Sequence, residues 1–345
     1  MTNFSDHNND GREITNIQQI PKVTIEAAQL FNQWSNDYKG SLSQPPEILW
    51  HYTNPDGLRG IVSSGQFWAT NAAFLNDQKE VIHTLDMTSR LLQNNEQVKR
   101  CSRESPLAKG VVAILSSLDS FIKYLDAYLV CFCESRDLLS QWRAYGSGGG
   151  YAISLNGPNL LEFVHGNLAS RDPGQHRVSL VQVLYAYDEQ EAIISGLLEQ
   201  WVNLFAQQSE WGPEPYTTSE IQLLFAECLS HLAISFKDPS FREEQEWRLI
   251  YRRSSLMNKD GTGYRISFRT RNQMLLPFVE MPKNGYSVPE EEPIPKNELL
   301  PISEVLVGPT QYPIQAGYAV QELLRAMGYK EADFMVMSSL VPLRY

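Results

Sequence analysis

The chain has 345 residues, 42% of them hydrophobic and 20% charged, and its formal net charge at pH 7 is −11. This length can bury a substantial core in one large domain or two of ordinary size. No apolar run approaches the roughly 18 residues that a membrane span requires. The polar start "MTNFSDHNNDGREIT" lacks the apolar core of a signal peptide. We therefore expect a cytoplasmic protein with no membrane contact.

The four cysteines predict neither a disulfide framework nor a metal site. Cys131 and Cys133 alternate within "YLVCFCE", a predicted buried strand in which both serve as small apolar residues. Cys101 and Cys228 stand alone, so the sequence has no C-x-x-C pair. The sequence indicates a reduced interior and no bound metal.

Two parts are predicted along the chain. Residues 1–46 comprise a disordered tail and a helix from about Thr24 to Tyr38, which ends at Gly40. Residues 47–345 are predicted to form a single α+β domain, because strands occur at both ends and helices dominate the middle. We expect a helical insertion at about 188–236.

The expected elements of this domain follow in chain order. A strand at 48–53 leads into a short helix closed by Gly65 and a second strand, "QFWAT". Helices at about 78–99 and 105–125 precede a strand at 128–133, and a short helix around Trp142 precedes the strand "YAISL". After the helical region come strands in "EWRLIYR", "YRISFR", "MLLPFVEM" and "ISEVLVG", a helix near 315–327 and a strand near 333–338.

His51 lies near the exit end of the first strand, in "ILWHYTNPDG". The strand residues before it and the turn residues after it place the imidazole where clefts form in sheet proteins. A lone histidine in such a place is more often a satisfied structural residue than a catalytic one. Its role therefore depends on what the fold brings beside it.

The segment "FREEQEWRLIYRR" combines an apolar face with a charged one. If 246–252 is a strand, its period of two places Glu246 and Arg248 on one face and the large apolar residues on the other. Glu244 lies one repeat earlier, at the mouth of the strand. A surface ladder of ion pairs would also explain this pattern.

Two loops have both a structural and a ligand-binding interpretation. The loop "YGSGGGY" lacks the spacing of a dinucleotide fingerprint and the G-K-[ST] of a phosphate loop, so it is either a flexible connection or a close approach to a ligand. In "NAAFLNDQKE", Asn71, Asn76, Asp77 and Glu80 could line a cleft. Alternatively, Asn76 and Asp77 cap the following helix and Glu80 lies in its first turn. Trp142 and Arg143 are equally open, because a tryptophan on a short apolar helix is usually core.

Seven motifs together resemble an uncharacterised bacterial family, domain of unknown function 2971. They are "LWHYTNPDGLRGIV", "FWATNAAFLNDQKE", "VCFCESRDLLSQWRAYG", "GGGYAISL", "FKDPSFREEQEWRLIY", "ISEVLVGP" and "SSLVPLRY", and they span about Ile48 to Tyr345. This resemblance implies no activity.

The layout is also similar to the ADP-ribosyltransferase superfamily: a first strand ending in histidine, a short helix with "GIVSSG", and a late strand opened by glutamate. This resemblance implies an ADP-ribosyltransferase-like split β-sheet core with a helical insertion, and NAD as substrate. It makes Glu246, His51 and Glu244 the catalytic candidates. The implied ligand-binding residues are His51, Tyr52, Thr53, Asn76, Trp142, Arg143, Tyr145, Tyr151 and Arg248.

The roles implied by the resemblance suit the chemistry. Cleaving the bond between nicotinamide and ribose develops positive charge on the sugar, which a carboxylate at Glu246 would stabilise. His51 would hold the adenosine-side ribose with support from Thr53, and Tyr145 or Tyr151 would stack on nicotinamide. Arg248 or Arg143 would pair with the pyrophosphate. The middle strand lacks an S-T-S triplet, so which tyrosine stacks stays open.

The charge of the chain is unevenly spread. Between Lys237 and Arg271 there are nine Lys/Arg and five Asp/Glu, a local +4 that leaves −15 for the remainder. A solvated face or a site for a phosphate-bearing partner would explain this segment. We therefore expect a macromolecular acceptor, either protein or single-stranded nucleic acid, and not a long duplex.

Three functions remain open. The first is an NAD-consuming ADP-ribosyltransferase, as in a toxin or phage-defence effector. The second is a non-catalytic nucleotide-binding sensor, and the third is a metal-dependent nuclease, for which Arg248 stands where a lysine is expected. The first two predict that His51 and Glu246 open into one cleft, and both of these interpretations fail if the two side chains lie on opposite faces of the sheet.

Overall fold

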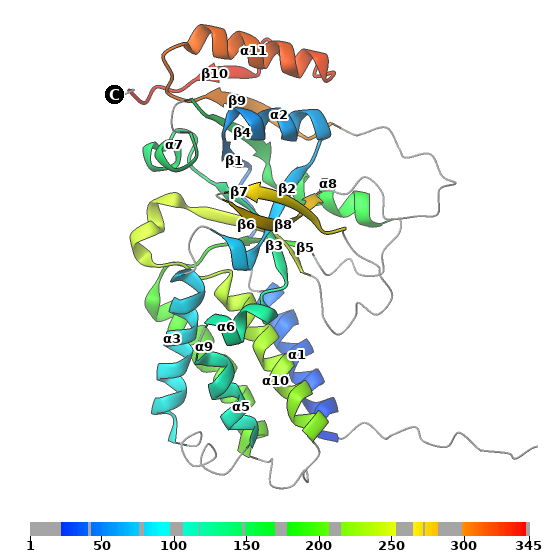
Figure 1. Cartoon of the computed structure of the whole chain (residues 1–345), viewed down its shortest axis with the longest axis vertical. Coiled ribbons are helices and arrows are strands. Elements are labelled where there is room, and N and C mark those ends of the chain that lie inside the picture. Colours follow the sequence, from blue (N-terminus) through cyan, green and yellow to red (C-terminus); the bar gives the residue numbers. More distant parts are fainter. Residues whose placement is uncertain are drawn as a thin grey trace, which may run out of the picture.

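The computed structural model describes residues 22–40, 43–75, 79–96, 106–116, 118–146, 149–169, 178–206, 215–252, 265–271, 273–281 and 299–342. The chain folds as a mixed α/β structure around one large open mixed sheet. In Figure 1 the strands fill the upper part of the molecule and a group of helices lies below them. Among the described residues, no helix combines the length and apolar character needed to cross a membrane.

The described strands all join this sheet. They are β1 (Ile48–Thr53), β2 (Phe67–Asn71), β3 (Ala127–Cys133), β4 (Tyr151–Asn156), β5 (Val178–Gln182), β6 (Glu246–Arg252), β7 (Ser267–Arg271), β8 (Met274–Met281), β9 (Ile302–Val307) and β10 (Val336–Ser338).

The helices lie on both sides of the sheet and below it. They are α1 (Lys22–Gly40), α2 (Pro55–Ser64), α3 (Lys79–Asn94), α5 (Pro106–Leu115), α6 (Leu118–Phe121), α7 (Leu139–Tyr145), α8 (Gly157–Ala169), α9 (Tyr187–Ala206), α10 (Pro215–Ala233) and α11 (Pro313–Ala326), with the short turns η1 (Ala72–Phe74), η2 (Ile122–Tyr124) and η5 (Pro239–Glu244).

Strand β3 is the point at which the sheet divides. Along one edge it pairs with β6 over its whole length, from Ala127 to Cys133. Along the other edge it pairs with β2 only at Tyr128 and Leu129, and with β1 only at Cys133. From β1 the sheet continues through β4 and β9 to β10, and from β2 it continues through β8 to β7. Strands β1 and β2 therefore diverge from a shared partner.

The strand registers divide the side chains between two faces. Trp50 pairs with Cys133, and Cys133 pairs with Glu246, so these three side chains share one face, which we call the Glu246 face. His51 and Phe132 alternate with them and lie on the opposite face, which we call the His51 face. This assignment decides which predicted site residues can meet.

Helices cover both faces. On the His51 face, α2, α8 and α11 contribute apolar residues to one core with the strands. The helices α1, α3, α5, α9 and α10 form the group below the strands in Figure 1, and their core continues onto Leu129 and Ile250 of the Glu246 face. A smaller core on the Glu246 face is built around Trp50 and Trp142, under α7.

The sequence predicts the strands better than the connections between them. The strands expected at 48–53 and in "EWRLIYR" have the bounds of β1 and β6. The helical stretch expected at 105–125 is divided among α5, α6 and η2. Both α8 and β5 were missed. The expected insertion at 188–236 holds α9 and α10, but these helices share their core with α1, α3 and α5, so the helical group also draws on earlier segments.

Close packing explains part of the glycine loop that follows α7. A Cβ atom on Gly150 would lie 2.3 Å from the Cα of Gly146 and 3.1 Å from the backbone oxygen of Thr53. A Cβ atom on Gly308 would lie 2.7 Å from the Cζ3 atom of Trp142. The Gly308 N–H donates to the Gly150 carbonyl over 2.8 Å. At these positions glycine allows backbones to approach each other, and Trp142 is a core residue.

We expect Gly150→Ala to lower the free energy of unfolding by about 1–3 kcal/mol, because the added methyl overpacks a site bounded by backbone. Gly60→Ala is the matched control, since a Cβ atom there meets nothing within 4 Å. In the interior of α2 this control should stabilise the chain by about 0.5–1 kcal/mol. Urea unfolding followed by tryptophan fluorescence measures both changes. A Gly150→Ala variant as stable as the parent would contradict the packing.

Candidate functional site

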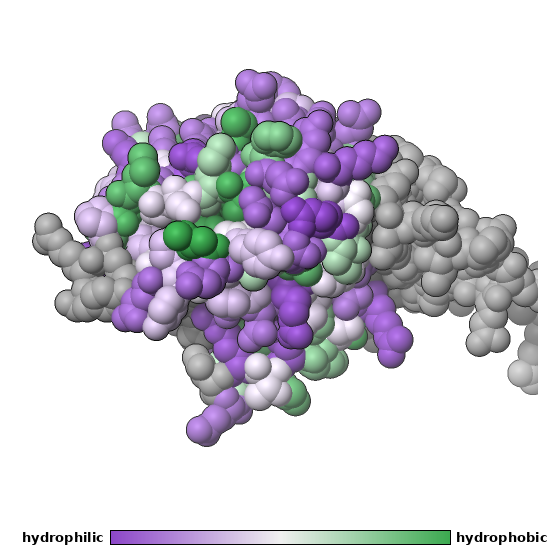
Figure 2. Space-filling view, turned by 90° about the horizontal axis from the view of Figure 1, so that it is seen from above, coloured by the Kyte–Doolittle hydropathy of each residue, from purple (hydrophilic) through white to green (hydrophobic). Residues whose placement is uncertain are grey.

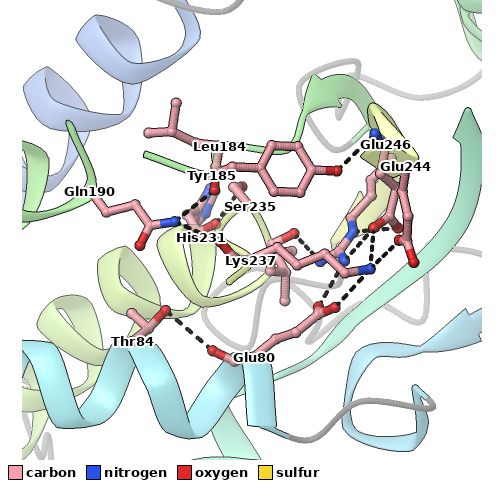
Figure 3. A network of polar contacts seen from close by, with 12 residues as sticks. Glu80, Thr84, Leu184, Tyr185, Gln190, His231, Ser235, Lys237, Glu244 and Glu246 are labelled. Carbon is pink, nitrogen blue, oxygen red and sulfur yellow. Dashed lines mark hydrogen bonds and ion pairs between the residues drawn. The ribbon is translucent and has the colours of Figure 1, made fainter. Parts of the chain in front are cut away.

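Five charged side chains meet on the Glu246 face, and we call them the ion-pair cluster (Figure 3). Glu80 comes from the first turn of α3, Lys237 from the connection between α10 and η5, and Glu244 from the end of η5. Glu246 and Arg248 occupy alternate positions of β6, so both point to the same face. All but Glu244 are buried.

All three guanidinium nitrogens of Arg248 donate hydrogen bonds to oxygen atoms. Its Nε donates to Oε1 of Glu246 over 2.9 Å and its Nη2 donates to Oε2 of the same carboxylate over 3.0 Å, a bidentate pair. Nη2 also donates to Oε2 of Glu80 over 2.7 Å, and Nη1 donates to the carbonyl of Ile234 over 2.8 Å. The side chain is only 2% exposed. The guanidinium therefore fixes the orientation of Glu246.

Lys237 is the cation on which the three carboxylates converge. Its Nζ lies 3.1 Å from Oε1 of Glu80, 2.7 Å from Oε2 of Glu244 and 2.9 Å from Oε2 of Glu246. The ammonium donates hydrogen bonds to Glu244 and Glu246 and forms an ion pair with Glu80. Figure 3 shows the lysine side chain reaching between Glu80 on one side and the two other glutamates on the other.

A left-handed backbone residue brings Glu244 and Glu246 to the same lysine. Gln245, between them, has φ 42° and ψ 53°, a conformation that non-glycine residues rarely adopt. Its side-chain oxygen accepts a hydrogen bond from the Ser135 hydroxyl over 2.8 Å. The backbone N–H of Glu246 donates to the Tyr185 hydroxyl over 2.9 Å. Strained residues of this kind are enriched at functional sites.

The surroundings move the pKa values of the two glutamates in opposite directions. Burial raises the pKa of Glu246, but the charges of Arg248 and Lys237 outweigh burial and bring it down to about 2. Burial raises the pKa of Glu244 above its ordinary value, and the charges of Glu246 and Glu80 add to this effect against the hydrogen bond from Lys237. Burial also raises the pKa of the Cys131 thiol, which hydrogen-bonds Glu246. The pKa of Glu246 is thus lowered by its cationic partners, whereas that of Glu244 is raised.

Two aromatic side chains lie at the exposed side of the cluster. Phe241 of η5 is 37% exposed, and the Lys237 ammonium lies 5.2 Å from its ring centroid. Tyr145, the last residue of α7, is 41% exposed. Burial of the Tyr145 hydroxyl raises its pKa, and the charges of Glu246, Lys237 and Glu244 act on it. An aromatic ring beside a carboxylate pair is a common arrangement for binding a sugar or a nucleoside.

His51 does not join this cluster. Its ring packs against Phe67 and Phe132, with centroids 5.2 and 5.7 Å away, on the His51 face. Its Nδ1 lies 2.9 Å from the backbone oxygen of Cys131, in the wedge where β1 and β2 diverge. Burial lowers the pKa of His51, so the imidazole is neutral and Nδ1–H is the donor. The single cleft expected from the sequence, lined by both His51 and Glu246, is therefore wrong, because neighbouring strand positions alternate between faces.

The remaining predicted binding residues also separate by face. Thr53 and Tyr151 pair with each other and lie on the His51 face, so Tyr151 is apart from Glu246. Tyr52 lies on the Glu246 face, where its hydroxyl donates to the Ser135 carbonyl over 2.8 Å. The indole N–H of Trp142 donates to Oδ1 of Asp137 over 2.7 Å, and the ring is buried. Of the two tyrosines, Tyr145 is the one on which the charges of Glu246, Lys237 and Glu244 act.

Two predicted residues do not bear on the cluster. Arg143 is exposed on α7. Asn76 lies outside the described residues, as does Asp77. In contrast, sequence analysis missed Lys237, Tyr185 and Phe241. In the sequence, Lys237 stood out only as the first residue of the basic segment, the stretch from Lys237 to Arg271. No local pattern links it to a glutamate on α3.

The basic segment is less positive than its composition indicates. Lys237 and Arg248 are neutralised within the ion-pair cluster. Arg252 is half-buried, with Nη1 donating to the Ser230 hydroxyl over 3.2 Å, and burial lowers its pKa to about 10. Arg253 lies outside the described residues. The arginines at the end of this segment, Arg269 and Arg271, lie on β7.

No metal site was found in the part of the chain that the structure describes: no three or more His, Cys, Asp or Glu side chains are grouped to hold an ion. The position at which Glu80, Glu244 and Glu246 converge is taken by the Lys237 ammonium.

One comparison with known proteins gives a match. Residues 141–249 match the model of the family described as "Protein of unknown function (DUF2971)". The matched stretch runs from α7 to β6 and includes Tyr145, Lys237, Glu244, Glu246 and Arg248. No curated protein matches the chain, and no solved structure matches it either. The family match supports the resemblance seen in the motifs but names no activity.

The cluster predicts a pH dependence of stability. Because the pKa of Glu246 is depressed in the folded state, its stabilising contribution is present above the unfolded value of 4.5 and is lost as the pH falls toward 2. Glu246→Gln removes this dependence, so the slope of the unfolding free energy between pH 4.5 and about 2 should fall by up to about 1.4 kcal/mol per pH unit. Urea titrations at several pH values measure the slope. Parallel slopes for both proteins would show that Glu246 is not held as an ion.

Proposed function

We propose that the chain binds NAD on the Glu246 face and transfers its ADP-ribose to a macromolecular acceptor. The observation that carries this proposal is the pair Glu244 and Glu246, bridged by Lys237 Nζ, whose pKa values are moved apart. Two carboxylates with divergent pKa values are the arrangement by which enzymes divide the roles of charge stabilisation and proton transfer. The resemblance to ADP-ribosyltransferases contributes only its glutamate half here, because His51 and Glu246 lie on opposite faces and the shared cleft that it implies is absent.

The proposed reaction assigns one role to each glutamate. The bond between ribose C1′ and the nicotinamide nitrogen breaks, and its electron pair leaves on the nicotinamide. Positive charge then develops on the ribose, and the Glu246 carboxylate stabilises it without being protonated. A nucleophilic atom of the acceptor bonds to C1′, and its proton passes to Glu244. Tyr145 is the residue placed to contact a planar ring.

The ion pairs explain how Glu246 would serve in this role. A carboxylate free to move would turn toward any cation, whereas Arg248 and Lys237 hold both of its oxygens in fixed positions. The described cluster contains three carboxylates and two cations, so it keeps one net negative charge when all are ionised. A preorganised negative site needs no rearrangement when the sugar becomes positive.

His51 has no direct part in this proposal, because it lies on the opposite face. Its neutral ring fills the wedge between β1 and β2 and satisfies the Cys131 carbonyl. That is the structural role which a lone histidine most often has.

A non-catalytic nucleotide sensor is the second candidate. The observation that favours it is that Lys237 is already paired with three carboxylates within the cluster, as expected for a rigid binding platform. A sensor and an enzyme differ in their need for the Glu246 charge. The next experiment separates them.

We expect Glu246→Gln to lower nicotinamide release by about 100-fold or more, because the amide cannot stabilise developing positive charge. Calorimetry should show that the affinity for NAD changes little. Glu322→Gln, on the exposed surface of α11, is the matched control and should leave both values unchanged. Chromatography of released nicotinamide gives the rate, and thermal melting confirms that each variant is folded.

The outcomes assign the function. Equal nicotinamide release by Glu246→Gln and the parent would remove Glu246 from catalysis, and NAD binding without release by the parent would favour the sensor. An absence of heat with millimolar NAD and ADP-ribose would reject both candidates. Tyr145→Ala, a change at a partly exposed side chain, tests binding separately and should weaken it without lowering the melting temperature.

A further inference from the structure

The β7–β8 hairpin, at one end of the sheet, carries positive charge that described carboxylates do not neutralise. Arg269 lies against two aromatic rings, with its Cζ atom 5.7 Å from the ring centroids of both Trp68 and Phe278. Burial lowers the pKa of Arg269, and the charge of Arg271 lowers it further.

Strand register places these residues on one face. Arg269 pairs with Leu276 and Arg271 pairs with Met274, while Phe278 alternates with them along β8. Trp68 stands opposite Glu280 on this face, the only carboxylate in the three strands β2, β8 and β7. Along β8, Glu280 is six residues from the partner of Arg271 and four from the partner of Arg269, about 20 and 13 Å of strand. Among the described residues, no ion pair joins Glu280 to either arginine.

The Arg269 guanidinium makes one side-chain hydrogen bond, and one of its nitrogens has no partner among the described residues. Its Nη2 donates to the Thr70 hydroxyl over 2.6 Å, which fixes the guanidinium against Trp68. Its Nε is buried and has no hydrogen-bond partner among the described residues. Trp68 itself is 45% exposed and stacks at a tilt on Phe278, with centroids 4.8 Å apart. A fixed cation and an exposed indole therefore lie side by side.

The other end of the sheet lacks this chemistry. Figure 2, which looks onto the end of the molecule that carries α11, shows apolar residues interspersed with hydrophilic ones and no continuous apolar patch. The arginine of α11, Arg325, is paired with both Glu322 and Asp333. The charge of Arg325 is therefore paired at that end of the sheet. At the hairpin, Arg269 and Arg271 have no carboxylate partner among the described residues and lie on the same face as the exposed ring of Trp68.

We propose that the β7–β8 hairpin, together with Trp68, is a docking surface for single-stranded nucleic acid. Phosphates bind Arg269 and Arg271, and a base stacks on Trp68. Single strands are bound in this way because every base presents a ring face and every linkage presents an anion. An acidic peptide would satisfy the arginines but would leave the indole unused. The surface is independent of the glycosyl-transfer proposal and is tested without NAD.

The test uses the full chain and fluorescein-labelled 20-nucleotide oligo-dT and oligo-U, followed by fluorescence anisotropy at 50–200 mM salt. The double variant Arg269→Gln/Arg271→Gln should weaken binding about 10-fold or more at the lowest salt. The slope of log K against log salt should fall by about 1.4, because each phosphate contact on a single strand contributes roughly 0.7. Trp68→Ala should weaken binding at least about 5-fold through lost stacking.

Two matched controls test whether binding depends on this particular surface. Phe268→Ala changes a residue that is 64% exposed on the same hairpin but on the opposite face, and it should leave binding unchanged. Arg325→Gln removes an arginine far along the sheet and should also have no effect. Thermal melting checks that the variants fold. Arg271→Gln alone, at an exposed position, gives the same direction of change if Trp68→Ala does not fold.

Several results would overturn the proposal. One is no change in anisotropy at 100 µM protein. Another is equal weakening by Phe268→Ala or Arg325→Gln. Competition by a 20-residue polyglutamate as strong as by unlabelled oligo-dT would assign the surface to acidic peptides. Nicotinamide release that is intact in the double variant has no bearing here, so failure of this inference and of the proposed activity are distinguishable.

Discussion

The salt bridges of Lys237 constrain the structure around them more than any apolar contact does. Burying a charge costs several kcal/mol, and only partners with good geometry offset that cost. The partners come from α3, η5 and β6, so the lysine can be satisfied only when the helical group is docked on the sheet. An apolar cluster of similar volume would serve stability equally well. The retention of charge here therefore agrees with a chemical role for Glu246 and Glu244.

Because the sheet divides at β3, its two faces carry different kinds of side chain at this point. Because β6 pairs with the whole of β3, the positions of Glu246 and Arg248 are rigidly set by backbone hydrogen bonds. On the other edge, β1 and β2 part, and the gap is filled by the rings of His51 and Phe67 with the help of the Cys131 carbonyl. At this junction, aromatic side chains thus fill the His51 face. The Glu246 face holds the ion-pair cluster, near which Phe241 and Tyr145 are partly exposed.

The sequence predicts what depends on neighbours in the chain and fails for what depends on distant partners. Alternation over six or seven residues was enough to give the bounds of β1 and β6, and to place Glu246 and Arg248 on one face. The pairing of Arg248 with Glu80 joins positions 168 residues apart and leaves no local pattern. The error about His51 has the same origin. A strand's period fixes which residues share a face within that strand, but only the register between strands shows which face meets which.

The net charge counted along a segment of the sequence differs from the charge that remains once ion pairs have formed in the folded structure. The segment from Lys237 to Arg271 has a net +4, yet its first cations are neutralised in the cluster, and the uncompensated ones lie at its end, on β7. Register carries the Glu246 face from β6 through Leu129, Thr70 and Phe278 to Arg269. Four interstrand spacings separate β6 from β7, roughly 19 Å. Leu129 and Ile250, which lie between them on this face, are packed under the helical group, so the carboxylates and the arginines share a face of the sheet but occupy separate parts of it.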